Sequence, residues 1–561
     1  MSGSEVAQNE EIFFNILDEP WILVRNKQGK VEELSVLETF RRAHELEIIN
    51  GELPTQDVAI LRFLLAILYS VFTRVDENGA FSLLQDLGIE EQHDEALRRW
   101  KALWDAPTLP IEPIEYYLGL NHDCFWLNHP KRPFYQVAGL KSSNEQKDTS
   151  QMVADIPPRA ERRFFTLRNG IGATTLSYSE AVRWLITLHA WDYAGKKAVT
   201  TDANGNRGSE NGGGTGWLGK LGVLYVQEPC LSKTLLMNLV LLNEKEELLA
   251  FGLPIWEDQQ ENPRTARKLE KQPMGYIELL TYQSRRVCLT AQDKKVIGVT
   301  VSYGDVFDKE NTFIEQMTAW QKNSKFETAP TYYPKIHNPE KKLWRNLTSL
   351  LPQASDSEQK TIVAGVIRWG QILKSNNLIR EDRLTVSAVG AEYGTANSVI
   401  EEVISDGLTI NTGLLTPLNR IWTRRIILAL KKTDECISKL GKLAQQFAKA
   451  SGSSNGNSRY SDASALAYYT FDNKFRLWLA SINPDTDSLD SRIIEWQEEV
   501  AKVMTDIGND LYEALNSQAI IGRTDKKNNK IIAAPVYFAD FRRSINKIMK
   551  SWREEKSDEQ S

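Results

Sequence analysis

The chain has 561 residues, of which 41% are hydrophobic and 25% charged, and its formal net charge is −6. These values are ordinary for a globular protein of more than one domain. A net negative charge argues against a protein that coats nucleic acid over its whole surface, although local basic faces are compatible with it.

The N-terminal sequence MSGSEVAQNEEIFF lacks the basic stretch and apolar run of a secretory signal. The most apolar segment, residues 58–72, is interrupted before it reaches the roughly 18 apolar residues of a membrane span, and it predicts a buried helix. The four cysteines are far apart in the sequence and form no C-x-x-C pair. We therefore expect a cytoplasmic protein with no membrane contact, no disulfide framework and no zinc site.

The first three quarters of the chain predict a mixture of strands and helices. Residues 21–25 and 31–35 flank the turn NKQGK and predict a hairpin. The helix predicted over 54–73 has Thr55 as its expected N-cap and Asp57 in its first turn. The other segments with helical periodicity are 35–46, 93–106, 177–195 (with Ser179 near its cap), 233–244 and 357–377.

Alternating and polar segments separate these helices. Residues 277–307 predict a small antiparallel sheet, and residues 383–407 predict a strand, a turn at Gly394 and a second strand or helix start. The polar segments 138–155 and 196–216 show no apolar period and predict loops.

From about residue 413 the pattern changes to long amphipathic segments, 415–450, 463–480, 489–514 and 538–552. Four such segments with short linkers predict a four-helix bundle. The expected fold class is α+β, with a large mixed N-terminal domain (1–410) that contains small antiparallel sheets, followed by the bundle (411–561). In the first bundle segment the predicted apolar face comprises Leu418, Ile421, Leu428, Ile437, Leu440, Leu443 and Phe447.

The segment GTGWLGKL matches seven of the eight positions of the phosphate-binding pattern G-x-x-x-x-G-K-[ST]. Leu221 stands where the magnesium-binding hydroxyl is required. The segment also follows a Gly- and Asn-rich stretch and precedes a strand-like one, whereas a P-loop follows a buried strand and opens a helix. Three interpretations remain: a nucleotide-dependent enzyme that uses Gly214–Lys220, a loop that leads into a strand, and backbone approach to nucleic acid.

No other motif predicts catalysis. The six histidines form no H-E-x-x-H pattern, and there is no G-x-S-x-G elbow. His122, Cys124 and His129 are close in sequence, but we interpret them as capping and packing residues. We expect neither a bound metal nor a cofactor.

A set of short motifs occurs in the order found in one protein family. The motifs are FNILDEPWILVR, LPTQDVAILRFLLAILYSVF, FWLNHPKRPFYQV, GTGWLGKLGVLYVQ, YQSRRVCL, MTAWQ, LWRNL and VGAEYG. Over nearly its full length the chain thereby resembles CasA, the large subunit of the type I-E CRISPR surveillance complex Cascade. The resemblance implies a non-catalytic protein that recognises the protospacer-adjacent motif (PAM) of double-stranded DNA from the minor groove.

It also implies a role in opening the duplex and in recruiting the helicase–nuclease that cuts the displaced strand. The implied partners are the other Cascade subunits, the CRISPR RNA, the target DNA and that helicase–nuclease. The protein would read the PAM, while base pairing to the RNA reads the remaining sequence.

The resemblance also places candidate DNA-binding residues in three segments. The glycine loop that enters the minor groove corresponds to YAGKK, with Gly195, Lys196 and Lys197. The family's groove-reaching lysine corresponds to Asn311, with Lys309 two residues before it. The glutamine wedge falls on Ala396 and Asn397, so the glutamine itself is missing, and the wedge would act through Asn397 or through backbone bulk.

Two further sets follow from the resemblance. The loop that anchors the subunit beside the RNA corresponds to RRFFTLRNG, with Phe165 or Phe164 as the anchor; the alternative is two core phenylalanines. Basic residues of the bundle would line a path for a DNA strand, and the alternative is a solvated helix face. These residues are Arg424, Arg425, Lys431, Lys432, Arg542, Arg543 and Lys547.

Two other hypotheses remain beside this one. The first is the nucleotide-dependent enzyme that uses Gly214–Lys220. The second is a scaffold that contacts only protein.

Overall fold

The computed structural model describes residues 14–142, 147–154, 156, 166, 168, 170–202, 205, 207, 214–258, 272–323, 331–351, 361–380, 382–525 and 530–558. Within them the chain forms two compact units, which we call the mixed unit and the helical unit. The bounds of the mixed unit are Met1–Lys341, Gln359–Arg380 and Thr385–Gly407. Those of the helical unit are Lys342–Glu358, Glu381–Leu384 and Leu408–Ser561.

The mixed unit is built around α2 (Pro54–Phe72), nearly all of whose side chains are buried. This helix is long and apolar enough to cross a membrane, but 94% of its most apolar window is buried inside the protein, as in a core helix. It packs against α4 (Ile111–Leu120), α6 (Tyr178–Trp191) and α8 (Tyr276–Leu280). The predicted buried helix is therefore confirmed.

Leu53, not Thr55, is the N-cap of α2, and Pro54 occupies the first helical position. Proline is favoured there because its fixed φ suits a helix and its missing N–H would have no partner in the first turn. The prediction of Thr55 as N-cap is therefore wrong.

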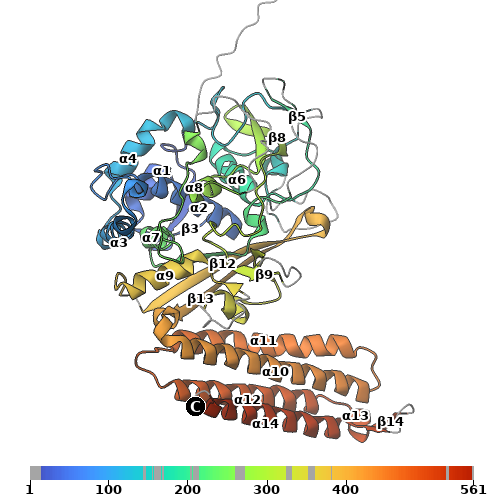
Figure 1. Ribbon diagram of the computed structural model, residues 1–561. Helices are drawn as coiled ribbons and strands as arrows, with labels where there is room; N and C mark the ends of the chain where they lie inside the picture. Colours follow the sequence, from blue (N-terminus) through green and yellow to red (C-terminus); the bar gives the residue numbers. More distant parts are fainter. Residues whose placement is uncertain are drawn as a thin grey trace, which may run out of the picture. The chain divides into compact units, whose positions relative to one another are not determined.

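The strands of the mixed unit form small antiparallel sheets, which confirms the predicted fold class for this region (Figure 1). The predicted N-terminal hairpin is present, and a third strand joins it in the order β2-β1-β3. A second sheet has the order β13-β12-β6, a third the order β10-β9-β11, and two further sheets are the pairs β4-β5 and β7-β8. The strands are β1 (Ile22–Asn26), β2 (Val31–Leu34), β3 (Leu46–Ile49), β4 (Lys141–Ser142), β5 (Thr200–Thr201), β6 (Val223–Gln227), β7 (Arg285–Gln292), β8 (Lys295–Tyr303), β9 (Trp320–Lys322), β10 (Tyr332–Pro334), β11 (Thr361–Ile362), β12 (Arg383–Tyr393) and β13 (Ile400–Asn411).

Several predicted boundaries are wrong. The expected helix over 233–244 ends at Met237, because the Asn238 side chain pairs with the β6 backbone: Val226 N–H donates to its Oδ1 at 2.9 Å, and its Nδ2 donates to the Val226 carbonyl at 2.7 Å. The predicted loops contain the paired strands β4 and β5. The remaining helices are α1 (Val36–Arg42), α3 (Ile89–Asp105), α5 (Ile171–Thr174), α7 (Leu231–Met237) and α9 (Gly365–Ser375).

The helical unit contains the four long helices that the periodicity predicts (Figure 1). Helix α10 packs against the other three, and stacked aromatic rings such as Trp478 and Trp496, 5.2 Å apart between centroids, fill the core. A short helix and a hairpin that the sequence pattern did not predict precede the last helix. The elements are α10 (Arg420–Ala450), α11 (Gly456–Ser481), α12 (Leu489–Glu513), α13 (Ser517–Ile521), β14 (Arg523–Asp525), β15 (Lys530–Ile532) and α14 (Ala534–Asp558).

Two residues of the apolar face predicted for the first bundle segment lie on the surface. Leu418 is 94% exposed and Ile421 is 47% exposed. Because α10 begins at Arg420, Leu418 precedes the helix and cannot share its phase. The first buried residues of the helix are Trp422 and Thr423.

A buried ion pair ties α2 to a distant segment of the mixed unit. Arg62 Nη1 and Nη2 donate to Oε1 and Oε2 of Glu315 at 2.8 and 2.9 Å, and the two side chains are 3% and 0% exposed. Trp217 Nε1 also donates to Glu315, at 2.7 Å, and so does the Met317 N–H, at 3.0 Å. All these donors lose their acceptor if the carboxylate is removed.

We predict that Glu315→Ala lowers the free energy of unfolding by about 3–5 kcal/mol, because it leaves the buried Arg62 charge without a partner. Urea unfolding followed by circular dichroism measures this change. The matched control is Glu47→Ala, which breaks the exposed Arg25–Glu47 pair at 2.9 Å and should cost less than about 1 kcal/mol. Equal losses in the two variants would contradict the prediction.

Candidate nucleic-acid interface

The candidate site is assembled at the C-terminal end of α6. This helix begins with a capping box in which Ser177 Oγ accepts from the Glu180 N–H at 3.2 Å and Glu180 Oε2 accepts from the Ser177 N–H at 2.8 Å. Ser177, two residues before the expected Ser179, is thus the N-cap. The helix ends at Trp191, and Asp192 follows as a buried C-cap residue.

Asp192 binds two cations in the interior. Its carboxylate accepts from Arg285 Nε of β7 and lies 2.8 Å from Lys197 Nζ. Burial raises the pKa of Asp192, but the charges of Lys197 and Arg285 outweigh this effect and hold the pKa below its usual value. Lys197, predicted to contact DNA, is only 7% exposed, and its charge is engaged in this cluster.

Arg285 extends the cluster to the backbone on both sides. Its Nη2 donates to the carbonyl oxygens of Tyr193 at 3.0 Å and of Gly214 at 2.8 Å. One guanidinium group thus holds the end of α6, the segment 193–197 and the start of the segment 214–222. We call these two segments the glycine loop (193–197) and the tight glycine segment (214–222).

The glycine loop lies against the turn between β12 and β13. The Ala194 N–H donates to the Asn397 carbonyl at 2.7 Å, and a Cβ added to Gly195 would lie 3.3 Å from the Ser398 carbonyl oxygen. The Tyr303 hydroxyl donates to the Gly195 carbonyl at 3.2 Å. Two predicted site segments that are far apart in the sequence are therefore adjacent in space.

The turn itself is exposed and has an unusual backbone. Residues 395–398, which we call the hairpin tip, are exposed, whereas the flanking Gly394 and Val399 are buried. Ala396 and Asn397 adopt φ of 56° and 52°, in the left-handed region that costs an L-residue such as alanine about 1–2 kcal/mol and is easier for asparagine. This conformation presents a compact, backbone-rich projection beside Gly195.

The third predicted segment is held by its own hydrogen bonds. The Asn311 N–H donates to the Tyr332 carbonyl at 3.0 Å, and Asn311 Oδ1 accepts from the Tyr332 N–H at 2.8 Å. This side-chain oxygen is occupied by β10, so a base-reading role would require it to change partners. Lys309 is exposed, with Nζ 5.6 Å from the Tyr333 ring centroid, and Lys196 is exposed as well.

The glycines of the tight glycine segment pack against neighbouring groups and do not form the nucleotide-binding P-loop that the sequence pattern suggests. A Cβ at Gly216 would lie 2.4 Å from the Ala190 carbonyl oxygen, one at Gly219 would lie 2.3 Å from the Tyr393 hydroxyl, and one at Gly222 would lie 2.2 Å from the Lys335 carbonyl. After a single turn, Leu218–Lys220, the chain enters β6 and not a helix. The glycines therefore allow close packing, and the P-loop context is absent from this segment.

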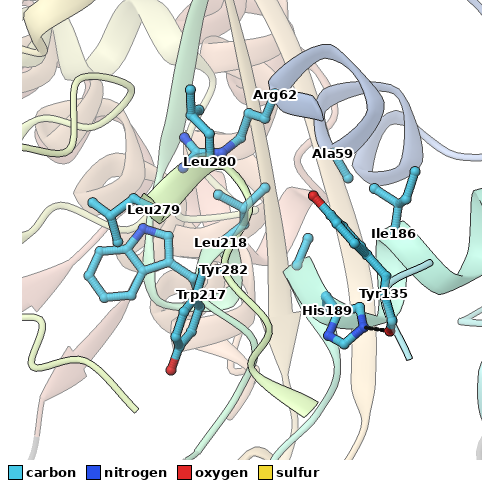
Figure 2. A pocket seen from close by; sticks show the side chains of 11 residues that line it. Ala59, Arg62, Tyr135, Ile186, His189, Trp217, Leu218, Leu279, Leu280 and Tyr282 are labelled. Carbon is cyan, nitrogen blue, oxygen red and sulfur yellow. Dashed lines mark hydrogen bonds between the residues drawn. The ribbon is translucent and has the colours of Figure 1, made fainter. Parts of the chain in front are cut away.

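A small cavity is lined in part by Trp217 and Leu218 of this segment (Figure 2). Its volume is about 30 Å³, and its lining includes Tyr135, His189, Trp217 and Leu218. His189 Nε2 donates to the Tyr135 carbonyl at 2.9 Å, and burial lowers the pKa of His189 to about 4. A cavity of this volume has room for one or two water molecules, which is too little for a nucleotide.

The basic residues predicted along the bundle fall into two groups. Arg425 and Lys432 are buried, and Lys432 Nζ lies 2.8 Å from Glu555, so these two are engaged inside the helical unit. The exposed group is Arg424, Lys431, Arg542, Arg543 and Lys547. The predicted anchors Phe164 and Phe165 lie outside the described residues.

Across the described residues, no group of three His, Cys, Asp or Glu side chains is placed to hold a metal ion. The four cysteines are all free thiols.

Comparisons with known proteins identify a family and several similar chains. The family model described as CRISPR-associated protein Cse1 matches residues 15–507. A curated relative from Thermus thermophilus, described as CRISPR-associated protein CasA/Cse1, is 25% identical over 443 residues, which cover 78% of each chain. The crystal structure of Thermobifida fusca Cse1 is 30% identical, with a TM-score of 0.81, and the match covers 96% of this chain and 98% of that one.

A similar chain also occurs in a structure described as a CRISPR RNA-guided surveillance complex. That chain is 17% identical, with a TM-score of 0.66, and the match covers 89% of this chain and 99% of that one. At this identity the likeness concerns the fold.

We predict that Gly216→Ala destabilises the protein by about 1–3 kcal/mol, because the added methyl group would meet backbone atoms that cannot rotate away. Thermal unfolding measures the effect. The control is Gly119→Ala on α4, where a Cβ meets nothing within 4 Å and helix propensity should add about 0.5–1 kcal/mol of stability. A neutral Gly216→Ala would show that this close packing is not required.

Proposed function

The chain belongs to the CRISPR-associated protein Cse1 family, and we propose that it is the large subunit of a CRISPR RNA-guided surveillance complex. In this proposal the subunit recognises the PAM of double-stranded DNA from the minor groove. It then promotes duplex opening and R-loop formation and recruits the helicase–nuclease. It carries out no catalysis of its own.

The observation that carries the proposal is the contact between the glycine loop and the hairpin tip. The resemblance of the sequence to the family assigns Gly195 to one DNA-contacting element, and Ala396 and Asn397 to another. These elements share the 2.7 Å hydrogen bond from Ala194 to Asn397, and the tip is exposed. A single DNA duplex can therefore meet both.

The chemistry of the two elements suits a tolerant reading of a short motif. Glycine allows the backbone to approach a groove closely, and the minor groove presents a degenerate pattern of acceptors. A compact tip that is pushed between base pairs would trade unstacking, roughly a few kcal/mol per step, for contacts with opened DNA. The CRISPR RNA would then read the remaining sequence by base pairing.

The structure gives less support to the two other hypotheses, the nucleotide-dependent enzyme and the protein-only scaffold. A nucleotide-dependent enzyme would need a phosphate loop that opens a helix, and the tight glycine segment enters a strand. A scaffold that contacts only protein gives no reason for an exposed tip with two residues in the left-handed region. A binding assay separates the scaffold from the DNA reader.

The experiment compares the surveillance complex reconstituted with and without this chain on target duplexes that carry a randomised PAM. We expect both tight binding and PAM selectivity to require the chain. Selectivity that persists without it would overturn the proposed function and leave a scaffold or a recruiter.

We predict that Asn397→Gly reduces discrimination between a correct and a wrong PAM by about 1–3 kcal/mol, the usual range for one lost base contact. Glycine tolerates φ of 52°, so the variant removes the amide and keeps the turn. Asn78→Ala, at an exposed position of the mixed unit outside the site, is the control. Unchanged discrimination in Asn397→Gly would assign the reading to the backbone of the tip.

A further inference from the structure

Among the residues that the structure describes, none places a counter-charge in contact with Lys220. It closes the single turn Leu218–Lys220 of the tight glycine segment and is half-buried. Its Cε lies 3.8 Å from the position of a Cβ on Gly214, and its Nζ lies 5.9 Å from the Trp217 ring centroid. Across the described part of the chain, no carboxylate or carbonyl oxygen forms an ion pair or a hydrogen bond with this ammonium group.

The charged groups that face Lys220 are mostly positive. They are Arg285 from β7 and Lys309 and Asp308 from the segment after β8. Arg285 already shares the carboxylate of Asp192 with Lys197. This part of the mixed unit therefore contains more positive than negative side chains. The two carboxylates are Asp192 and Asp308, and the four cations are Lys197, Lys220, Arg285 and Lys309.

The excess affects the protonation of Lys220. Burial, followed by the charges of Arg285 and Lys309, lowers its pKa to about 8. A half-buried cation without a partner destabilises the fold, whereas an anion placed between Lys220 and the exposed Lys309 would stabilise both charges. The arrangement is therefore complementary to a ligand with negative charge.

We propose that Lys220 and Lys309 bind one backbone phosphate of the DNA duplex that reaches the glycine loop and the hairpin tip. This inference rests on the proposed function and adds a phosphate contact to the same interface. The contact fixes the position of the duplex and carries no sequence information.

A DNA phosphate fits the surroundings better than a free nucleotide. The nearby cavity of about 30 Å³ cannot hold a base and a sugar, and Lys309 is exposed. The side chain of Arg285 links the segment that carries Lys220 to the glycine loop, because it donates to the carbonyls of both Gly214 and Tyr193. In this proposal a duplex bound at Gly195 also passes the segment that carries Lys220.

The test uses the reconstituted complex and a duplex that has the correct PAM but no match to the CRISPR RNA, so that strand separation does not contribute. We expect Lys220→Met to weaken binding and to reduce the slope of log K against log salt by about 0.9, the value for one phosphate contact. Lys220→Arg should retain most of the slope. PAM selectivity should stay as in the wild type, because a phosphate contact does not read bases.

A pH series gives a second readout. The pKa of Lys220 in the protein without DNA is about 8, so this lysine loses most of its charge when the pH is raised from 7 to 9. Over this range wild-type binding should weaken about ten-fold more than binding by Lys220→Arg, because the arginine stays charged. Folding is checked by the melting temperature, which in Lys220→Met should equal or exceed that of the wild type, because an unpaired buried charge is removed. The matched control is Lys245→Met, an exposed lysine of the mixed unit, which should leave the slope unchanged.

Each outcome decides a different point. An unchanged salt slope and pH profile in Lys220→Met, with PAM selectivity retained, would overturn the phosphate site and leave the proposed function intact. A wild-type complex that shows no PAM selectivity would overturn the proposed function, and the slope change would then report only non-specific DNA binding. Competition by inorganic phosphate or ADP at concentrations that leave Lys220→Met unaffected would assign the site to a free phosphate ligand and overturn the DNA assignment.

Discussion

The buried carboxylate of Asp192 is the interaction on which the candidate interface depends. It lies at the end of α6, binds Arg285 and Lys197, and holds Arg285 where it can donate to the carbonyls of Tyr193 and Gly214. A buried charge is costly unless it is paired, so this cluster strongly favours one arrangement of its surroundings. Both glycine-containing segments take their position from it.

The same cluster explains why charge is unevenly distributed at the site. The cations of this region outnumber its carboxylates, and the excess includes the half-buried Lys220 and the exposed Lys309. This local excess of positive charge would suit a polyanionic partner. The hairpin tip also depends on its neighbours. Ala396 and Asn397 adopt backbone conformations that are rarely populated, and such conformations persist only where the surrounding structure holds them in place.

The tight glycine segment shows how a motif can mislead. Its glycines are spaced as in a nucleotide-binding P-loop, yet each of them packs against a different neighbour: the backbone of Ala190, the hydroxyl of Tyr393 and the backbone of Lys335. Spacing alone could not distinguish close packing from phosphate binding, because both require the absence of a side chain. The element that follows the motif, a strand and not a helix, is what separates them.

The sequence by itself determined the mixed architecture, the N-terminal hairpin, the strand β12 with the turn that follows it, and the four long helices, because apolar periodicity is a local property of the chain. It left open whether a strand or a helix follows that turn. It also identified the family and, through the resemblance, predicted that Gly195 and the hairpin tip contact DNA. Only the tertiary structure decided that Lys197 is engaged with Asp192 and Asn311 Oδ1 with Tyr332. It also decided that no described residue pairs with the charge of Lys220. Those properties depend on partners that are distant in sequence. Packing brings such partners together, and no periodic pattern in the sequence reveals which residues will meet.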